Sequence, residues 1–348
     1  MKCGRGPGGG KTAGSEICPA AVDTTFDGFN RGTNAGRSCW LVAGTFCNEV
    51  VMGTFAKKRE SCKECDFYEQ VHAETGTTDV EIASIDISAF THIGRVRKTN
   101  EDRYFIEKLA DGAILLAVAD GLGGEVAGDY AAEIMMGKLA GIHQIEKGHE
   151  QEQLSLLAME ADLAVTDKKE KDPDLEGMGT TLVCVLLRGR TAYWVHVGDS
   201  RLYFLRNNTL TQLTEDQTLA RFLLAEGEIT PEEVPTHYSR HVMDQCIGCG
   251  YCEPETGRLN LKNHDLLILT SDGLHKEMTA EKMASILNRR TDIKTKACNL
   301  VEAALKTGGN DNITIVIAKN TANEKGALMR KSKLCGQVPV NGLRSAKA

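Results

Sequence analysis

The sequence LLAVADGLGG at residues 115–124 ends an apolar run with a carboxylate. Five apolar residues precede Asp120, three glycines fall within the next four positions, and a helix-like pattern begins near Ala127. A buried strand of this kind carries Asp120 to its carboxyl end and presents it in a turn with almost no side-chain bulk. A carboxylate in that place is either a metal ligand or an N-cap of the following helix.

Two more apolar runs have an aspartate at one end. The run LLILTSDG at residues 266–273 leads into Asp272 and a glycine, and Asp311 opens the run NITIVI at residues 312–317. One such aspartate alone would be interpreted as a helix cap. Three of them at strand ends predict a site for a hard cation with oxygen ligands, assembled across a sheet.

Composition narrows the range of partners. The chain has 348 residues, a net charge of −7 and 5% aromatic residues, so it lacks the basic excess and the stacking side chains that nucleic-acid binding uses. No apolar run reaches the length of about 18 residues that spans a membrane, and the N-terminus lacks the apolar core of a signal peptide. We therefore expect a cytoplasmic protein without a membrane partner, whose twelve cysteines are reduced.

The first part of the chain differs from the rest. Eleven glycines fall in the first 55 positions, six cysteines precede residue 66, and apolar periodicity is poor. We predict a cysteine-rich module at residues 1–78, which ends in a polar linker at residues 74–79, and a catalytic domain at residues 79–320. The tail at residues 321–348 is basic with little apolar patterning, and we expect it to be disordered.

The middle of the chain alternates between groups of strands and groups of helices. Apolar patterning predicts strands at residues 82–90, 103–107, 113–119, 180–187, 192–197, 202–206, 265–270 and 312–318. Helical spacing predicts helices at residues 127–146, 151–168, 215–227, 279–289 and 293–306. This order favours an α+β fold with two sheets covered by helices over a simple alternating α/β fold.

Residues 83–319 resemble the protein phosphatase 2C family, the metal-dependent serine/threonine phosphatases, in their compact bacterial form. Seven motifs carry the resemblance in order: GRVR with NED at 94–102, VADGLGG at 118–124, GMGTT at 177–181, VGDSR at 197–201, LTED at 213–216, SDG at 271–273 and GNDN at 309–312. Each motif alone is weak, and the ordered series is a strong signal. The resemblance implies an αββα sandwich, with two central antiparallel sheets flanked by helix pairs, and two Mn²⁺ or Mg²⁺ ions at one end.

The resemblance also assigns roles to individual residues. It implies that Asp120 bridges the two ions, that the Gly121 carbonyl binds one of them, and that Asp272 and Asp311 complete the direct ligands. Glu101 and Asp102 act mainly through water, and Arg97 holds the phosphoryl group with a guanidinium fork. A third, weaker metal has Asp174 and Glu176 as its candidates. The turn that contains Asp199 is interpreted as structural, with its carboxylate bound to backbone.

Two departures from the family pattern concern the proton donor and the flap. Leu122 stands where animal members have a histidine, so the residue that protonates the leaving group is unassigned. His92 is either the candidate acid or a hydrogen-bonded structural residue. The segment at residues 221–256 matches the mobile flap of bacterial relatives, but it contains the run CIGCGYC at residues 246–252. Cys246, Cys249 and Cys252 are either a metal or redox site, with His237, His241 or Cys298 as a further ligand, or inert loop thiols.

The N-terminal segment resembles the small cysteine-rich "two-CW" module of bacterial signalling proteins, although its first Cys-Trp pair is missing. The resemblance rests on six cysteines and their neighbours: Cys3, Cys18, Cys39, Cys47, Cys62 and Cys65. They would suit an iron–sulfur cluster or Zn²⁺, and the alternative is a reduced set without metal. We favour a metal, because this glycine-rich segment has little else to stabilise it.

The sequence therefore predicts a cytoplasmic bacterial phosphatase that hydrolyses phosphoserine or phosphothreonine on protein partners of a serine/threonine kinase, with a cysteine-rich module that regulates or localises it. The alternative is a redox- or metal-sensing protein built on an inactive phosphatase-like scaffold, and the retention of Asp120, Asp272 and Asp311 argues against it. A dinucleotide enzyme is a poor interpretation, because Val126 stands where its glycine pattern requires glycine.

Overall fold

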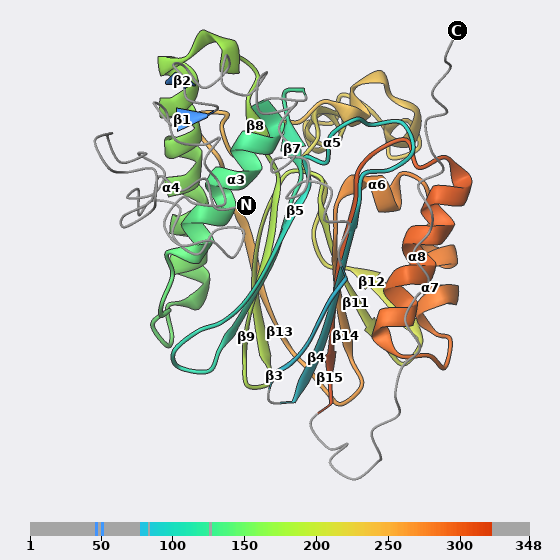
Figure 1. Cartoon of the computed structure of the whole chain (residues 1–348). Helices are drawn as coiled ribbons and strands as arrows, with labels where there is room; N and C mark the ends of the chain where they lie inside the picture. The colour runs from blue at the N-terminus through green and yellow to red at the C-terminus, as the bar shows by residue number, and fades with distance from the viewer. Residues whose placement is uncertain (1–45, 48–49, 52–76, 83, 125–126, 322–348) are drawn as a thin grey trace, which may run out of the picture.

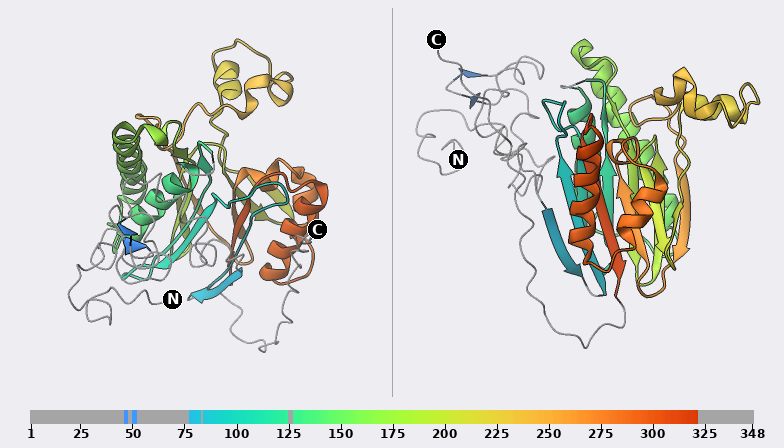
Figure 2. Two further views of the ribbon diagram at one scale, coloured as in Figure 1. Left: turned by 45° about the horizontal axis from the view of Figure 1, so that its top comes forward. Right: turned by 90° about the vertical axis from the view of Figure 1, so that its right-hand side faces the viewer.

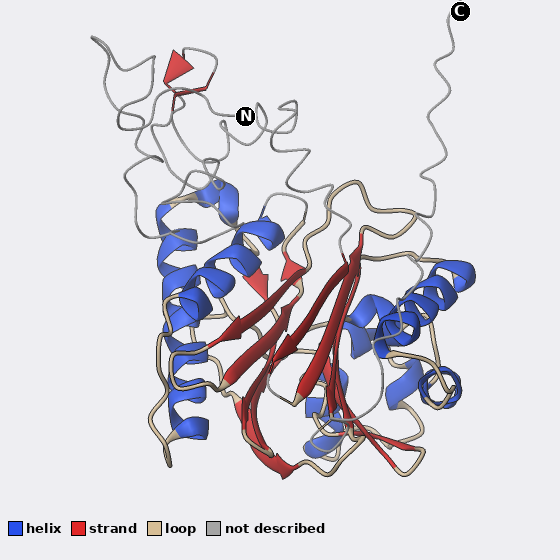
Figure 3. Cartoon of the chain, turned by 60° about the horizontal axis from the view of Figure 1, so that its bottom comes forward, coloured by secondary structure: helices blue, strands red, loops and turns tan. Residues whose placement is uncertain are grey.

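The structure is a computed structural model, and it describes residues 46–47, 50–51, 77–82, 84–124 and 127–321. Two antiparallel sheets lie face to face, with helices on both outer sides (Figures 1 and 3). The predicted αββα sandwich is confirmed. None of the described helices is both long and apolar enough to cross a membrane.

The first sheet has five strands and the second has six, and every neighbouring pair is antiparallel. The first sheet runs in the order β13 (Glu255–Asn260), β10 (Thr191–Val197), β9 (Leu182–Arg188), β6 (Ile114–Ala119) and β5 (Arg103–Lys108). The second runs β12 (Thr209–Gln212), β11 (Arg201–Arg206), β14 (Leu266–Thr270), β15 (Ile313–Asn320), β4 (Ile85–His92) and β3 (Thr77–Ile82). Two short pairs join β7 (Gly121–Leu122) to β8 (Gly179–Thr180), and β1 (Phe46–Cys47) to β2 (Val50–Val51).

Helices cover the outer face of each sheet. On the first sheet lie α3 (Ala127–Ala140) and α4 (Glu150–Lys171), and on the second lie α7 (Ala280–Leu287) and α8 (Ile293–Thr307). Shorter helices are α5 (Leu219–Ala225), α6 (Asp272–His275) and the 3₁₀ turns η4 (Pro173–Leu175), η5 (Val234–Thr236) and η6 (Tyr238–His241). The segment that carries α5 projects from one end of the sandwich (Figure 2).

Strand β6 shows why the central strands are apolar at every position. All six of its residues are buried. Leu115 and Ala117 face the core under α3 and α4, whereas Leu116 and Val118 face the core between the sheets. An antiparallel strand that is covered on both faces loses the usual alternation of apolar and polar residues. Burial of a leucine side chain stabilises the fold by about 1.5–3 kcal/mol. The continuous apolar run of β6 therefore favours a position between the helices and the other sheet.

The structure corrects several predicted boundaries. Residues 77–79 belong to β3, which pairs with β4, so the predicted linker ends earlier and the boundary between residues 78 and 79 falls inside a strand. The predicted strand at 82–90 is split between β3 and β4. Helix α3 ends at residue 140, directly before Gly141, because glycine is a poor helix former. Apart from β1 and β2, the rest of the predicted cysteine-rich module lies outside the described residues, as does the tail from residue 322.

Candidate metal and phosphate site

Four strand ends meet at one end of the sandwich and bring the predicted aspartates together. The end of β6 lies beside the start of β5, and the end of β14 lies beside the start of β15. Asp120 follows β6, Asp272 begins α6 and is separated from the end of β14 by one residue, and Asp311 lies just before β15. All three line one pocket. Its full lining is Arg97, Glu101, Asp120, Gly121, Leu122, His241, Met243, Asp272, Lys276, Asp311 and Asn312.

Asn312 holds the loop that carries Arg97 and Glu101 against this end of the sheet. Its side-chain oxygen accepts from the Glu101 backbone N–H at 2.8 Å, and its amide group donates to the carbonyls of Ile93 and Thr99 at 2.9 Å each. Gly94 lets the same loop pass close to the segment before β15. A Cβ there would press on the Asp311 carbonyl and lie 2.8 Å from the Gly309 carbonyl. The GNDN motif therefore positions the loop as well as supplying a carboxylate.

The acidic side chains around the pocket are buried close to one another. The Ser271 hydroxyl donates to Asp102 at 2.7 Å, but burial, with the charges of Asp272 and Asp311, raises the pKa of Asp102 to about 7. Burial and the charges of Asp272 and Asp102 raise the pKa of Asp120 well above its ordinary value. Without a counter-ion, this cluster favours protonation over charge.

Two basic side chains provide part of the missing positive charge. Nη2 of Arg97 donates to Oδ2 of Asp311 at 2.8 Å, and the Arg97 side chain is 46% exposed. The ammonium of Lys276 pairs with Asp272 and lies 3.4 Å from Oδ2 of Asp199. Burial opposes the ionisation of Asp272, but the charges of Lys276 and His275 outweigh it and lower the pKa of that carboxyl.

The remaining carboxylate oxygens fit divalent cations. Three carboxylate oxygens are buried without a hydrogen-bond partner: Oδ1 of Asp102, Oδ1 of Asp199 and Oδ1 of Asp272. A buried acceptor without a partner is costly, and a hard cation with oxygen ligands satisfies such atoms. Among the residues that the structure describes, no three acidic, histidine or cysteine side chains are already arranged so that they could hold an ion by themselves. The donor set suits ions that keep part of their water, as Mg²⁺ does.

The β7–β8 pair holds the backbone around Gly121. The Asp120 carbonyl accepts from the Thr180 hydroxyl and from the Thr181 backbone N–H, both at 2.9 Å. The Asp120 N–H donates in turn to the Thr181 hydroxyl at 3.0 Å. A Cβ on Gly121 would collide with the backbone of Gly128 at the start of α3. The glycine after Asp120 is therefore needed for the close approach of the helix.

Three residues that the sequence interpretation did not assign to the pocket belong to this site. Asp199 is buried beside Lys276 and Asp272, and burial, with the Asp272 charge, raises the pKa of Asp199 to about 7. The interpretation of its carboxylate as a backbone ligand was wrong. Asp199 follows the buried strand β10, which is the same strand-end signal that located Asp120. Lys276 and His241 line the pocket without a comparable signal in the sequence.

The motif at residues 213–216 fixes the turn that carries Asp199. Arg201 forms a bidentate ion pair with Asp216, with Nε–Oδ1 and Nη2–Oδ2 distances of 2.7 and 2.6 Å. His275, two residues after the motif SDG at residues 271–273, reaches the Asp199 carbonyl with Nε2 at 3.0 Å. These contacts explain two of the sequence motifs as supports of the acidic cluster.

Other predicted residues lie apart from the pocket lining. Asp174 is in η4 and Glu176 directly follows it, and both are exposed. The His92 ring accepts from the Gly94 N–H at 2.9 Å through Nδ1, and burial lowers its pKa. The structural interpretation of His92 is the one that the hydrogen bond supports.

The flap cysteines form a compact loop that packs on α4. Cys246 and Cys249 are half-buried, Cys252 is buried, and the side chains of Cys246 and Cys249 are hydrogen-bonded to each other. Cys298, a predicted further ligand, lies on α8 against the other sheet, and His237 bonds to Ser239 at 2.7 Å. The prediction of a metal site here finds no support among the described residues, in which no cysteine or histidine group could hold an ion. Cys3, Cys18, Cys39, Cys62 and Cys65 lie outside the described residues, and for Cys47 only the backbone is described.

Comparison with known proteins gives one consistent answer. The family model of protein phosphatase 2C matches residues 91–307. Serine/threonine protein phosphatase PstP of Mycobacterium tuberculosis is 38% identical over 226 residues, which are 65% of this chain and 43% of PstP, so the chain spans less than half of that relative. Serine/threonine phosphatase stp of Listeria welshimeri is 34% identical over 247 residues, which cover 68% of this chain and 96% of the relative.

A solved structure agrees in fold. The crystal structure of the catalytic domain of the serine/threonine protein phosphatase PstP in complex with two manganese ions aligns with a TM-score of 0.60 and 35% identity, over 68% of this chain and 97% of that chain. The sandwich, the acidic pocket at one end of it and the match over residues 91–307 together show that the chain belongs to the protein phosphatase 2C family.

Proposed function

We propose that this chain is a metal-dependent protein phosphatase that hydrolyses phosphoserine and phosphothreonine on other proteins. The observation that carries the proposal is the shared pocket of Asp120, Asp272 and Asp311 with Arg97 at its rim. The relatives named as serine/threonine phosphatases, and the PstP structure with two manganese ions, support the same activity.

The residues that would hold two Mn²⁺ or Mg²⁺ ions are the three aspartates and the Gly121 carbonyl, with Glu101 and Asp102 acting through water. The unpartnered Asp102 and Asp272 oxygens support this assignment, and Asp199 joins the set on the same grounds. When bound, such ions lower the pKa of water and neutralise phosphoryl oxygens during in-line displacement. Asp174 and Glu176 are not among these residues, because they do not line the pocket.

Arg97 is placed to bind the phosphoryl group of the substrate. Its guanidinium lies in the pocket, where it pairs with the Asp311 carboxylate, and nearly half of its side chain is exposed. A planar fork of N–H donors matches two phosphoryl oxygens at once. Arg97 would exchange its bond with Asp311 for the phosphate when Asp311 binds metal, which orients the phosphorus toward the acidic cluster.

The proposal is tested by hydrolysis of a phosphothreonine peptide with Mn²⁺ present and after EDTA treatment. We expect turnover with Mn²⁺, no turnover with EDTA, and loss of turnover in Asp272→Asn. Asp167→Asn is the matched control, because Asp167 is exposed on α4 and pairs only with Lys171 in the described structure. Mn²⁺-independent turnover, or full activity of Asp272→Asn, would contradict the proposal and favour an inactive scaffold or another chemistry.

A further inference from the structure

The loop at residues 246–252 is built so that two thiols face each other beside the pocket. The Cys249 N–H donates to the Cys246 carbonyl at 3.4 Å, which closes a four-residue turn. A turn of this kind brings its first and last Cα atoms within about 7 Å, the range that a disulfide bridges. The two side chains are hydrogen-bonded to each other in the reduced state, and the Cys249 thiol also donates to the Tyr251 carbonyl at 2.7 Å.

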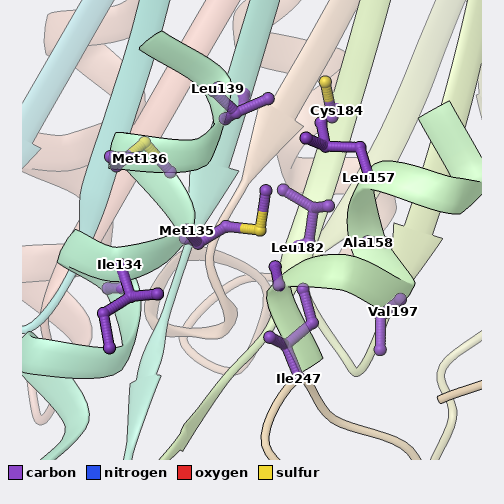
Figure 4. Close-up of a cluster of buried hydrophobic side chains, with 14 of the residues drawn as sticks. Ile134, Met135, Met136, Leu139, Leu157, Ala158, Leu182, Cys184, Val197 and Ile247 are labelled. Atoms are coloured by element: carbon purple, nitrogen blue, oxygen red, sulfur yellow. The ribbon is translucent and has the colours of Figure 1, made fainter. Parts of the chain in front are cut away.

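Contacts with helix α4 and with the core fix the backbone of this loop. Oδ1 of the buried Asp162 accepts from the backbone N–H groups of Gly248 and Gly250, at 2.6 and 3.2 Å. Lys169 donates to the Gly248 carbonyl. Ile247, between the two cysteines, points into the core beside Leu182 and Ala158 (Figure 4). The backbone between the two thiols is thus fixed, because Ile247 is buried in the core.

The same loop is bonded to the backbone of the acidic site. Ile247 and Thr180 exchange two backbone hydrogen bonds of 2.9 Å, and the Thr180 hydroxyl donates to the Asp120 carbonyl. On the other side, His241 and Met243 precede the loop and line the pocket. Cys246 is therefore connected to the pocket in two ways: through the hydrogen bonds of the neighbouring Ile247 to Thr180, and through the preceding segment that contains His241 and Met243.

We propose that Cys246 and Cys249 are a redox-active dithiol, which closes to a disulfide in the presence of a hydroperoxide and thereby lowers turnover at the pocket. The effect on turnover rests on the proposed phosphatase function, whereas disulfide formation does not. Cys252 is buried in the core cluster under α4 and takes no part. Cys184 and Cys298 are buried in separate places in the fold.

The chemistry is a two-electron oxidation by the hydroperoxide. The Cys249 thiolate attacks the peroxide oxygen, the O–O bond breaks, and the leaving oxygen departs as alkoxide or hydroxide and takes up a proton. The Cys246 sulfur then attacks the sulfenic sulfur of Cys249, the S–O bond breaks, and the hydroxyl leaves as water with the Cys246 proton. The hydrogen bond from the Cys246 thiol lowers the pKa of Cys249, which makes Cys249 the attacking sulfur.

The disulfide must draw the two sulfurs to a separation of about 2.05 Å. Ile247 cannot follow, because it is fixed in the core and paired with Thr180. The displacement therefore falls on Cys246, whose sulfur lies against β8, and on the residues before it. We expect turnover to fall by about 5-fold or more, the lower end of the coupling between two sites in one protein.

The test uses the full chain, first reduced and then treated with hydrogen peroxide, with the peroxide removed before Mn²⁺ is added. Trypsin cleaves after Arg240 and Arg258, so all three loop cysteines fall in one peptide at residues 241–258. After alkylation of free thiols, we expect this peptide to carry one alkyl group, on Cys252, and to lack two hydrogen atoms. Oxidation of Met243 would instead add an oxygen atom and would resist dithiothreitol.

The same samples are assayed for turnover of a phosphothreonine peptide and for Mn²⁺ affinity by calorimetry. We expect peroxide to lower turnover in the native chain, dithiothreitol to restore it, and Cys246→Ser and Cys249→Ser to resist it. Cys252→Ser is the matched control and should respond as the native chain does. Absence of the 246–249 disulfide, or an equal loss of turnover in Cys246→Ser, would overturn the proposal. A reduced chain without Mn²⁺-dependent turnover would contradict the phosphatase function instead, and the peptide mass would still show whether the dithiol forms a disulfide.

Discussion

The ammonium of Lys276 pairs with Asp272, the residue four positions before it, and lies 3.4 Å from the carboxylate of Asp199. A protein cation thus occupies the acidic cluster that we propose to hold divalent ions. Its positive charge relieves the repulsion between the carboxylates, and it also competes for the oxygens that a metal would use.

We expect Lys276→Met to bind Mn²⁺ more tightly than the native chain. Removal of the ammonium frees Asp272 and Asp199 for the ions, and a partly exposed ion pair of about 1 kcal/mol corresponds to a change in Kd of roughly 5-fold. Isothermal titration calorimetry measures the difference. Lys282→Met is the control, since Lys282 is exposed on α7 away from the pocket lining. Weaker Mn²⁺ binding by Lys276→Met would show that the ammonium supports the ions.

Arg97→Ala should lower kcat/KM for a phosphothreonine peptide by roughly 10- to 100-fold, because each charge-assisted hydrogen bond to phosphate contributes about 1.5–3 kcal/mol. The kcat/KM of Arg97→Lys should lie between those of the native chain and Arg97→Ala, since lysine keeps the positive charge but lacks the forked guanidinium group. Mn²⁺ affinity should not weaken, because loss of Arg97 frees Asp311. Steady-state kinetics and calorimetry check the two statements separately. An Arg97→Ala enzyme with native kcat/KM would remove Arg97 from the phosphate site.

Gly94→Ala should reduce both stability and turnover. Gly94 has a φ of +83°, and a Cβ there would press on the Asp311 carbonyl. Gly112→Ala is a matched control, because Gly112 has a φ of +84° with open space around it. The control should show only the backbone strain, about 1–2 kcal/mol by urea unfolding, and native turnover. Equal losses in the two variants would show that the close approach at Gly94 is unimportant.

Cys249 should react with iodoacetamide at lower pH than its neighbours. The hydrogen bond from Cys246 lowers the pKa of Cys249 to about 6, whereas burial raises the pKa of Cys252 to about 12. The charged groups that face the pair are Asp162, which disfavours the thiolates, and Lys169, which favours them. A lowered pKa keeps the thiolate populated down to that pH, so at pH 7 Cys249 should be alkylated first. Mass mapping of residues 241–258 over a pH series measures this order, and faster alkylation of Cys252 would contradict it.

Much of the fold was predictable because its central strands are unusually apolar. Runs such as β6, β14 and β15 are buried on both faces, so their patterns mark the middle layers of the sandwich. Edge strands β12 and β13 were missed, because their exposed or half-buried residues carry little apolar signal. Strand β3 was mistaken for a linker for a similar reason, since its polar residues give little apolar signal, although the strand pairs with β4 along its backbone and Asp79 accepts from the Ser88 hydroxyl of β4 at 2.8 Å.

The site was predictable wherever a buried strand delivers a carboxylate, and less so elsewhere. Asp120, Asp272 and Asp311 follow that pattern and share the pocket. Asp199 has the same signal but was assigned to a turn, because the glycine and serine around it suggest local hydrogen bonding. Lys276 and His241 reach the pocket through the geometry of α6 and the flap, which spacing along the sequence does not specify.

The most direct test of the account is anomalous diffraction at the manganese edge from crystals soaked in MnCl₂. We expect two peaks on either side of the Asp120 carboxylate, at metal–oxygen distances of about 2.0–2.5 Å, with Asp272 and Asp311 as further ligands and Arg97 released from Asp311. Peaks elsewhere in the molecule, or none at these aspartates, would contradict the claim that this end of the sandwich is a binuclear metal centre.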